Sequence, residues 1–309
     1  MRLVFMGTPD FAVASLAALV ESGHEIVLAV TQPDKPKGRG HRLAPPPVKE
    51  FALERGIEVY QPASVRTEEA FQRLAACGAD AFIVAAYGKI LPEAVLKLPK
   101  HGCINVHASL LPKYRGAAPI QWSIANGETV TGVTTMQMDA GLDTGDMLLK
   151  TEVEITPEDT GETLHDKLAA AGAEVLLETL ARLEAGTLTR ETQDDSLSCY
   201  APMLSKETSR IDFGKTPAEI VNLVRAMNPY PAAHTLYQGK RMRAFRAECI
   251  ASSGAEPCGT ILAASEKGID VKCAGGAVRI TEVQFDGKKR MQVADYLRGN
   301  TVELGGILG

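Results

Sequence analysis

The sequence predicts an α/β protein with a doubly wound, mainly parallel sheet, followed by a small β-barrel domain. The first observation is an opening βαβ unit, in which apolar runs at residues 3–6 and 26–30 flank a segment with helical periodicity. Such a unit is right-handed and builds a parallel sheet. The second observation is the last third of the chain, where short β-type runs alternate with glycines, as is typical of a small barrel. A chain of 309 residues is also long enough for two domains.

The elements of the first domain follow from apolar periodicity and from capping residues. Thr8 is expected to cap the first helix and Pro9 to begin it, and Thr160 is expected to cap a long last helix. Helices are predicted at residues 48–55, 68–76, 118–126 and 160–185, and strands at residues 59–60, 81–86, 103–107, 133–138 and 147–155. The first turn lacks the G-x-G-x-x-G pattern, so a nicotinamide dinucleotide is not expected.

The second domain begins after a polar, irregular stretch. We interpret residues 186–205 as a linker between a catalytic domain at residues 1–185 and a second domain at residues 206–309. Thr216 and Glu219 are the two ends of a predicted capping box, with Pro217 at the first helical position. Beyond that helix, strands are predicted at residues 233–237, 240–249, 260–263, 268–273 and 277–285.

The composition is that of an ordinary globular chain, with 45% hydrophobic and 23% charged residues. The longest apolar run, residues 81–87, is far too short to span a bilayer, and the N-terminus is expected to be a strand and a turn rather than a signal peptide. The six cysteines form no C-x-x-C pair, which gives zinc and thioredoxin-type functions little support and fits a reducing compartment. We therefore expect a cytoplasmic protein with no membrane partner.

Charge is distributed unevenly along the chain. Residues 206–309 carry 15 basic and 11 acidic side chains, a net charge of +4, whereas the preceding residues carry 18 and 27, a net charge of −9. A basic domain joined to an acidic one suggests a polyanionic partner for the basic domain. A solvated basic surface without a partner is the alternative at so modest a charge.

The chemistry is expected at a strand end near the middle of the chain. Residues 103–107 alternate like a short strand, so Asn105 and His107 share one face. A loop punctuated by Pro112 and Gly116 follows, and open α/β sheets place their ligands at loops after the carboxyl ends of strands. Taken alone, a histidine at a strand end is more often a hydrogen-bonded structural residue.

A second loop, residues 138–146, packs three carboxylates and two glycines into nine residues. If this loop folds beside His107, one aspartate can orient the imidazole and stabilise its charge. A solvated turn and a weak divalent-cation loop are the alternatives, although the EF-hand spacing and its terminal glutamate are missing.

These motifs resemble the folate-dependent formyltransferases. The resemblance rests on Asn105-x-His107, the Ser109-Leu-Leu-Pro-Lys-Tyr-Arg-Gly116 loop and Asp143. Further segments resemble the members of the family that act on methionyl-tRNA, namely residues 7–11, 31–34, 116–120, 136–139 and 141–146. The resemblance covers nearly the whole chain and implies a Rossmann-like catalytic domain followed by an OB-like domain that binds tRNA.

The resemblance also implies a reaction, the transfer of a formyl group from 10-formyltetrahydrofolate to the α-amino group of initiator methionyl-tRNA, with no metal required. Asn105 and His107 would donate hydrogen bonds to the tetrahedral oxyanion, and Asp143 would accept the proton of the amine. The residues expected to contact the folate are Ser109, Leu110, Leu111, Pro112, Ile90 and Leu91. No obligatory protein partner is evident.

A long loop at residues 31–49 breaks the regular pattern of the first domain. From Lys35 to Lys49 it has five Lys or Arg residues and no acid. In the tRNA formyltransferases that the chain resembles, the matching insertion approaches the acceptor end of the tRNA; a mobile surface loop is the alternative. The candidate tRNA contacts are Lys35, Lys37, Arg39 and Arg42 in this loop, and Arg241 and Arg243 in the second domain.

Two other functional classes stay open on the sequence. One is a formyltransferase or formyl-folate hydrolase that acts on a small molecule, since purine-pathway formyltransferases share the Asn, His and Asp residues. The other is a non-enzymatic RNA-binding protein on a catalytically dead scaffold. The basic loop and the second domain argue against the first class, and the intact motif residues argue against the second.

Overall fold

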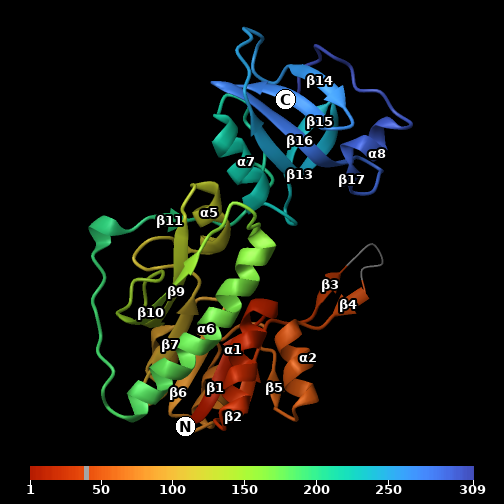
Figure 1. The fold of residues 1–309 in the computed structure, drawn as a ribbon. Coiled ribbons are helices and arrows are strands. Elements are labelled where there is room, and N and C mark those ends of the chain that lie inside the picture. Colours follow the sequence, from red (N-terminus) through yellow and green to blue (C-terminus); the bar gives the residue numbers. More distant parts are fainter. Residues whose placement is uncertain (38–41) are drawn as a thin grey trace. The chain divides into compact units, whose positions relative to one another are not determined.

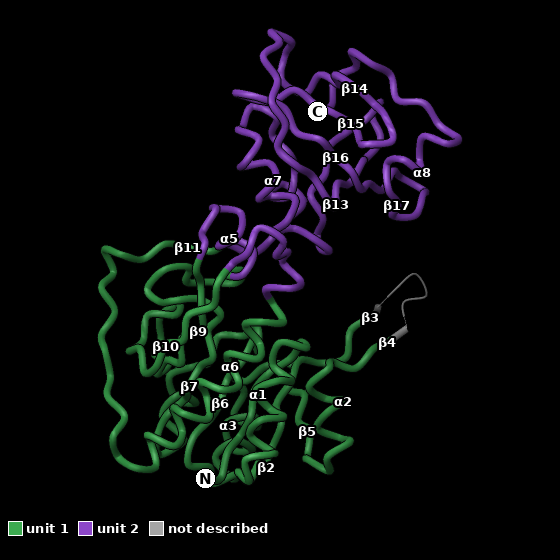
Figure 2. Tube along the Cα trace, in the orientation of Figure 1, with its two compact units in different colours: residues 1–119, 130–154, 165–201 green, residues 120–129, 155–164, 202–309 purple. Residues whose placement is uncertain are grey.

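The computed structural model describes residues 1–37 and 42–309, except for the side chains of Lys37 and Arg42. The chain forms two compact units, each made of three segments (Figure 2). Unit 1 comprises Met1–Pro119, Val130–Glu154 and His165–Ala201, and unit 2 comprises Ile120–Thr129, Ile155–Leu164 and Pro202–Gly309. Within the described ranges, no helix is long and apolar enough to cross a membrane.

Unit 1 is built on a seven-stranded sheet (Figure 1). Its strands in spatial order are β10 (Met147–Glu154), β9 (Val130–Gln137), β7 (Cys103–His107), β6 (Ala81–Ala85), β1 (Arg2–Gly7), β2 (Glu25–Val30) and β5 (Val59–Tyr60). The strands from β7 to β5 run parallel, whereas β9 and β10 are antiparallel to their neighbours. The mainly parallel sheet predicted from the βαβ opening is confirmed.

Helices cover both faces of this sheet. They are α1 (Asp10–Glu21), α2 (Pro47–Glu54), α3 (Glu68–Ala75), α4 (Glu93–Leu96) and α6 (Gly161–Glu184), which belongs to unit 1 from His165 onward. Cys103 lies in a buried cluster with residues of α3 and α4, whereas Thr135 of β9 bonds the Thr179 hydroxyl of α6 at 2.7 Å on the other face. Because side chains alternate along β7, Asn105 and His107 share the face of Cys103.

The two predicted helix caps of unit 1 have different outcomes. The cap prediction for Thr8 was wrong, because Pro9 takes the N-cap position and α1 begins at Asp10 without a side-chain cap. The Thr8 hydroxyl instead donates to the Tyr87 carbonyl at 3.1 Å. Thr8 thus ties the end of β1 to the segment after β6. Thr160 does cap α6, since its hydroxyl accepts from the Thr163 N–H at 3.3 Å while the Thr163 hydroxyl accepts from the Thr160 N–H at 2.9 Å.

Unit 2 holds a small antiparallel sheet, whose strands lie in the glycine-separated runs from which a small barrel was predicted. Its order is β12 (Ala233–Tyr237), β13 (Lys240–Ile250), β16 (Gly276–Phe285), β15 (Gly268–Cys273) and β14 (Ile261–Ser265), with β17 (Met291–Gln292) paired to β16. Unit 2 also contains most of α5 (Pro119–Ala125), and two helices, α7 (Pro217–Ala226) and α8 (Val293–Leu297), contact its sheet. Their Ile220, Val224 and Val293 side chains join the buried cluster of the sheet, so the helices and the sheet share one core.

The basic segment at residues 31–49 is more regular than its composition indicates. β3 (Lys35–Lys37) pairs in antiparallel fashion with β4 (Arg42–Ala44) and forms a two-stranded arm (Figure 1). At the base of this arm, the Lys49 ammonium pairs with the Asp34 carboxylate at 2.8 Å, and this hydrogen-bonded ion pair lowers the pKa of Asp34. Lys49 is therefore already paired with a carboxylate.

The segment interpreted as a linker, residues 186–205, also contains ordered contacts. β11 (Tyr200–Ala201) pairs in parallel with β8 (Arg115–Gly116), and a short 3-10 helix spans Asp195–Leu197. The pattern within the segment could not indicate these contacts, because the partner strand lies far away in the sequence.

The capping box of α7 makes the stability of unit 2 sensitive to Thr216. The Thr216 hydroxyl accepts from the Glu219 N–H at 3.3 Å, and the Glu219 carboxylate accepts from the Thr216 N–H at 2.9 Å. Thr216→Ala removes the first bond and is expected to lower the free energy of unfolding by about 1 kcal/mol. Trp122, the one tryptophan of the chain, lies in unit 2, so its fluorescence during denaturant unfolding measures the change. Thr301→Ala, at an exposed position, is the control, and equal midpoints for the two variants would contradict the role of the cap.

Candidate active site

His107 lies at the end of β7, with one side of its imidazole held by the backbone. Its side chain is 6% exposed, and Nε2 lies 2.9 Å from the carbonyl oxygen of Tyr114. A carbonyl oxygen can only accept a hydrogen bond, so Nε2 carries a proton in this arrangement. The neutral imidazole therefore keeps its free lone pair on Nδ1, which is the nitrogen that remains available for chemistry.

Asn105 precedes His107 by two residues and lies on the same face of β7, as the alternation predicted. The residue is 9% exposed, and its side-chain amide has no hydrogen-bond partner among the described residues. An amide that is nearly buried is costly to leave unbonded unless water or a ligand binds it. Asn105 thus offers an amide donor on the same face of β7 as the His107 imidazole.

Thr134 of β9 folds the loop that follows β7. Thr134 pairs with His107 in the antiparallel register. Its hydroxyl donates to the Ser109 carbonyl at 2.7 Å and accepts from the Leu111 N–H at 3.0 Å. These bonds bend the loop so that the Tyr114 carbonyl returns to the imidazole. Thr134 was not predicted from the sequence, although a hydroxyl residue inside the strand predicted at residues 133–138 was a usable signal.

The three aspartates of the second loop differ in what each carboxylate contacts. Asp139 and Asp146 accept hydrogen bonds from threonine hydroxyls, at 2.8 and 3.0 Å. The Asp143 carboxylate instead lies between β7 and β8. Its Oδ2 accepts from the Gly116 N–H of β8 at 2.8 Å and lies 3.8 Å from Nδ1 of His107 at the end of β7. The structure therefore selects Asp143 as the aspartate that faces the imidazole.

Asp143 and His107 face each other without a direct hydrogen bond. Their separation of 3.8 Å exceeds hydrogen-bond range and leaves an interaction between charges or across a shared water. The two side chains are 15% and 6% exposed, so solvent screens their interaction less than on an open surface. Asp143 also has a φ of +54°, a left-handed conformation that a non-glycine residue keeps only when its surroundings support it.

The residues predicted to contact folate differ in exposure. Ile90 follows β6, the strand beside β7, and is 65% exposed, whereas the next residue, Leu91, is 3% exposed and belongs to the buried cluster of that face. Ser109 and Leu111 are buried as well. Such residues can meet a ligand through the Ile90 side chain and through backbone groups of the loop, rather than through buried side chains.

The predicted tRNA contacts in the β3–β4 arm are described only in part. Arg39 lies outside the described residues, as do the side chains of Lys37 and Arg42. Lys35, at the start of β3, is exposed, so its ammonium group is accessible to a polyanion.

Arg241 and Arg243, the predicted contacts of the second domain, lie beside His234. Arg243 pairs with His234 in the antiparallel register and donates to the Gln284 side chain at 3.2 Å. The pKa of His234 is lowered, first by burial and then by the positive charges of Arg241, Arg243 and Arg210. Several cations therefore converge on this part of the sheet, which favours an anionic ligand there.

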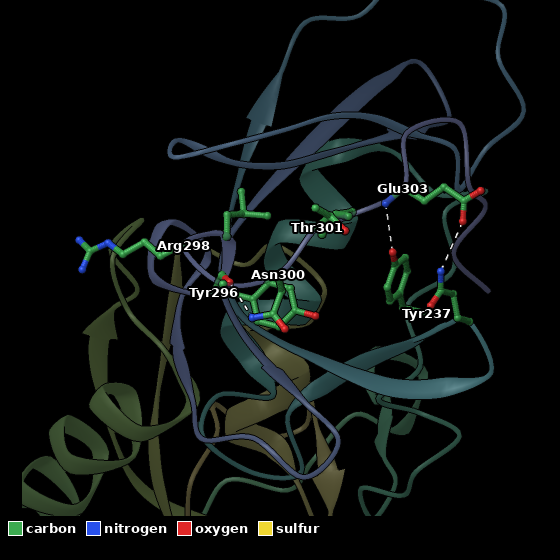
Figure 3. A pocket seen from close by; sticks show the side chains of 10 residues that line it. Tyr237, Tyr296, Arg298, Asn300, Thr301 and Glu303 are labelled. Carbon is green, nitrogen blue, oxygen red and sulfur yellow. Dashed lines mark hydrogen bonds between the residues drawn. The ribbon is translucent and has the colours of Figure 1, made fainter.

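Unit 2 also contains a pocket of about 840 Å³. It is lined by Tyr237, Gln238 and residues 296–303 (Figure 3). Its polar groups bond one another, since the Tyr237 hydroxyl accepts from the Glu303 N–H at 3.1 Å and the Asn300 amide donates to the Tyr296 carbonyl at 2.8 Å. Among the described residues of the whole chain, no group of three or more His, Cys, Asp or Glu side chains is placed to hold a metal ion. The Asn105, His107 and Asp143 constellation remains the stronger candidate for catalysis.

Two family models match the chain. The model described as Formyl transferase matches residues 1–180, and the model described as Formyl transferase, C-terminal domain, matches residues 203–301. The chain is 54% identical to a protein of Ruminiclostridium cellulolyticum named methionyl-tRNA formyltransferase, with 100% of both chains covered. It is 51% identical to a protein of the same name from Geobacter metallireducens, with 100% of this chain and 99% of that one covered.

Solved structures share the fold at low sequence identity. An N-formyltransferase of Helicobacter canadensis, in complex with folinic acid and dTDP-3-aminofucose, has a TM-score of 0.67 at 19% identity and covers 91% of this chain and 98% of its own. HypX of Aquifex aeolicus, in complex with tetrahydrofolic acid, has a TM-score of 0.66 at 19% identity and covers 96% of this chain and 47% of its own. At this level of identity the likeness concerns the fold alone.

The contact between His107 and the Tyr114 carbonyl predicts the tautomer of the neutral ring. At a pH where the ring is neutral, nitrogen NMR of histidine-labelled protein should show a protonated Nε2 and an unprotonated Nδ1. His107→Gln assigns the signal among the six histidines. Asp143→Asn leaves the carbonyl contact in place and should preserve the tautomer, whereas a proton on Nδ1 of the neutral ring would contradict the bond to Tyr114.

Proposed function

This chain belongs to the formyl transferase family, and on that premise we propose that it transfers the formyl group of 10-formyltetrahydrofolate to the α-amino group of initiator methionyl-tRNA. Similarity over the full length to enzymes named for that activity supports the substrate. The observation that carries the chemistry is the convergence of Asn105, His107 and Asp143 at one strand end, with Asp143 3.8 Å from His107. In this proposal residues 1–185 form the catalytic domain, residues 206–309 form the tRNA-binding domain, and residues 186–205 link the two.

The reaction joins the methionyl amine to the formyl carbon and breaks the bond between that carbon and N10 of the folate. The amine nitrogen attacks, and the electron pair of the carbonyl moves to oxygen, so the tetrahedral intermediate carries an oxyanion that needs fixed donors. The free Asn105 amide is such a donor. Collapse of the intermediate expels the folate nitrogen, which takes up a proton while the former amine loses one.

His107 contributes to this step as a cation. Its Nε2 proton is committed to the Tyr114 carbonyl, so the ring can donate to substrate only through Nδ1, after a second proton has arrived there. The resulting imidazolium faces Asp143, whose negative charge stabilises it. Asp143 in turn accepts the proton of the attacking amine, directly or through one water molecule.

The two substrates approach from surfaces with different chemistry. The folate lies against Ile90, Leu91 and the backbone of residues 109–112. The tRNA meets the β3–β4 arm through Lys35, Lys37, Arg39 and Arg42, and meets the second domain through Arg241 and Arg243. All six cysteines are free thiols, which fits a reducing cytoplasm, and the proposed reaction requires no protein partner.

Substitution of the three catalytic residues tests the mechanism. Asn105→Ala and His107→Ala should each lower kcat about 10²- to 10³-fold, the usual loss for an oxyanion donor. Asp143→Asn should lower kcat about 10²- to 10⁴-fold, because it removes the proton acceptor, while KM for the folate changes much less. Formyl transfer to methionyl-tRNA is measured beside transfer to small amines and to water.

Asp139→Asn is the matched control for Asp143→Asn, because Asp139 lies in the same loop and bonds the Thr144 hydroxyl. It should retain nearly the parent kcat. Near-parent turnover in Asp143→Asn would refute the mechanism, and preference for a small amine over methionyl-tRNA would refute the substrate.

The salt dependence of tRNA binding tests the second domain. Each phosphate contact contributes about 0.7 to 0.9 to the slope of log K against log salt. The Arg241→Gln and Arg243→Gln double variant should therefore flatten the slope by roughly 1.4 to 1.8 and weaken binding, with little change in kcat at saturating tRNA. Lys267→Gln, at an exposed turn of the same domain, is the control. Equal slopes for the parent and the double variant would leave the domain without a phosphate-binding role.

A further inference from the structure

Residues 191–201, which we call the strap, are fastened to both loops of the proposed site. Near its start, the backbone of Glu191 exchanges two hydrogen bonds with that of Met147, at 2.8 and 2.9 Å. At its end, β11 pairs with β8, so that the Arg115 N–H donates to the Cys199 carbonyl at 2.9 Å. The strap therefore spans from the start of β10 to the loop after β7, and all of these residues belong to unit 1.

Gln193 is the side chain of the strap that reaches the catalytic aspartate. Its Nε2 donates to the backbone carbonyls of Asp143 and Gly145, at 2.8 and 2.7 Å. Its Oε1 accepts two bonds from the Arg115 guanidinium, at 3.0 and 2.8 Å. Both N–H groups and both lone pairs of the amide are thus used, and the residue is 8% exposed.

These bonds close a ring around Asp143. Gln193 holds its backbone carbonyl, Arg115 holds Gln193, and the next residue, Gly116, donates its N–H to the Asp143 carboxylate. Asp143 needs such support, because its φ of +54° is unfavourable for a residue with a Cβ. The Nη2 group of Arg115 that donates to Gln193 also pairs with the Asp195 carboxylate, at 2.8 Å.

We infer that Gln193 is a positioning residue for catalysis: it holds Asp143 in its left-handed conformation, so that the carboxylate faces His107. This inference rests on the proposed function, in which Asp143 accepts the proton of the amine. Proton transfer demands placement within a fraction of an ångström, and small displacements cost large factors in rate. Gln193 touches no reacting atom and acts through Asp143.

Gln193→Glu tests the inference in the full chain. The new side chain has the same length and still accepts from Arg115, but it loses both donors and turns negative charge toward the Asp143 and Gly145 carbonyls. We expect kcat to fall about 10- to 100-fold, with KM for folate and for methionyl-tRNA changed less than about threefold. Gln193→Met, which removes the donors without adding charge, should behave alike, and it replaces Gln193→Glu if that variant does not fold.

Asp194→Asn is the matched control, because Asp194 is the next residue of the strap and its carboxylate bonds Ser196. It should retain the parent kcat and KM. The decisive comparison adds Gln193→Glu to Asp143→Asn: if Gln193 acts through Asp143, the second substitution causes little further loss. Losses that multiply, or a near-parent kcat in both Gln193 variants, would overturn the inference.

A readout independent of activity separates this inference from the proposed function. The ring nitrogens of His107 sense the Asp143 charge, so Gln193→Glu should displace their NMR signals in the same direction as Asp143→Asn, and Asp194→Asn should not. Absence of formyl transfer to methionyl-tRNA by the parent protein would overturn the proposed function alone. Unmoved His107 signals in both Gln193 variants would overturn the positioning role alone.

Discussion

The hydrogen bond from the Gly116 N–H to the Asp143 carboxylate is the constraint on which the site depends. It joins the loop after β7 to the loop after β9, so the position of each loop fixes that of the other. Gly116 has a φ of +118°, and a Cβ at that position would lie 2.7 Å from the Ala201 carbonyl oxygen. Only glycine fits this approach. The geometry of the three proposed catalytic residues is therefore set by backbone contacts as much as by the side chains themselves.

Local rules of the sequence were sufficient where the interacting residues are close together in the chain. Strand alternation placed Asn105 and His107 on one face, and the Thr216 capping box needs only four consecutive residues. The cap prediction for Thr8 was wrong because α1 begins one residue later, with Pro9 at the N-cap, and the Thr8 hydroxyl donates to the Tyr87 carbonyl, which no local pattern brings near. Gln193 could not have been found for the same reason: its contact with Asp143 spans 50 positions and comes from a segment without periodicity.

The second domain shows how little a net charge says about the availability of its cations. Arg279 is held by Asp270, and Arg290 is paired with Glu282 and stacks on the Phe245 ring at 4.3 Å. These two guanidinium groups are paired with carboxylates of the same sheet. A count of basic residues therefore includes cations whose charge is already compensated. Arg241, Arg243 and Arg210, which lower the pKa of His234, differ from these paired arginines. Their positive charges repel one another, so a bound anion would relieve that repulsion.

The late position of residues 191–201 in the chain bears on how the enzyme is made. A chain that grows from its N-terminus completes all seven strands of the first sheet by residue 154 and can begin to fold while synthesis continues. The Asp143 loop nevertheless lacks its partner amide until residue 193 has been added, and β8 lacks β11 until residue 201 has been added. In a nascent chain that folds in this order, the sheet therefore forms before the contacts that hold the Asp143 loop and β8, and the proposed site is completed only after residue 201 has been added.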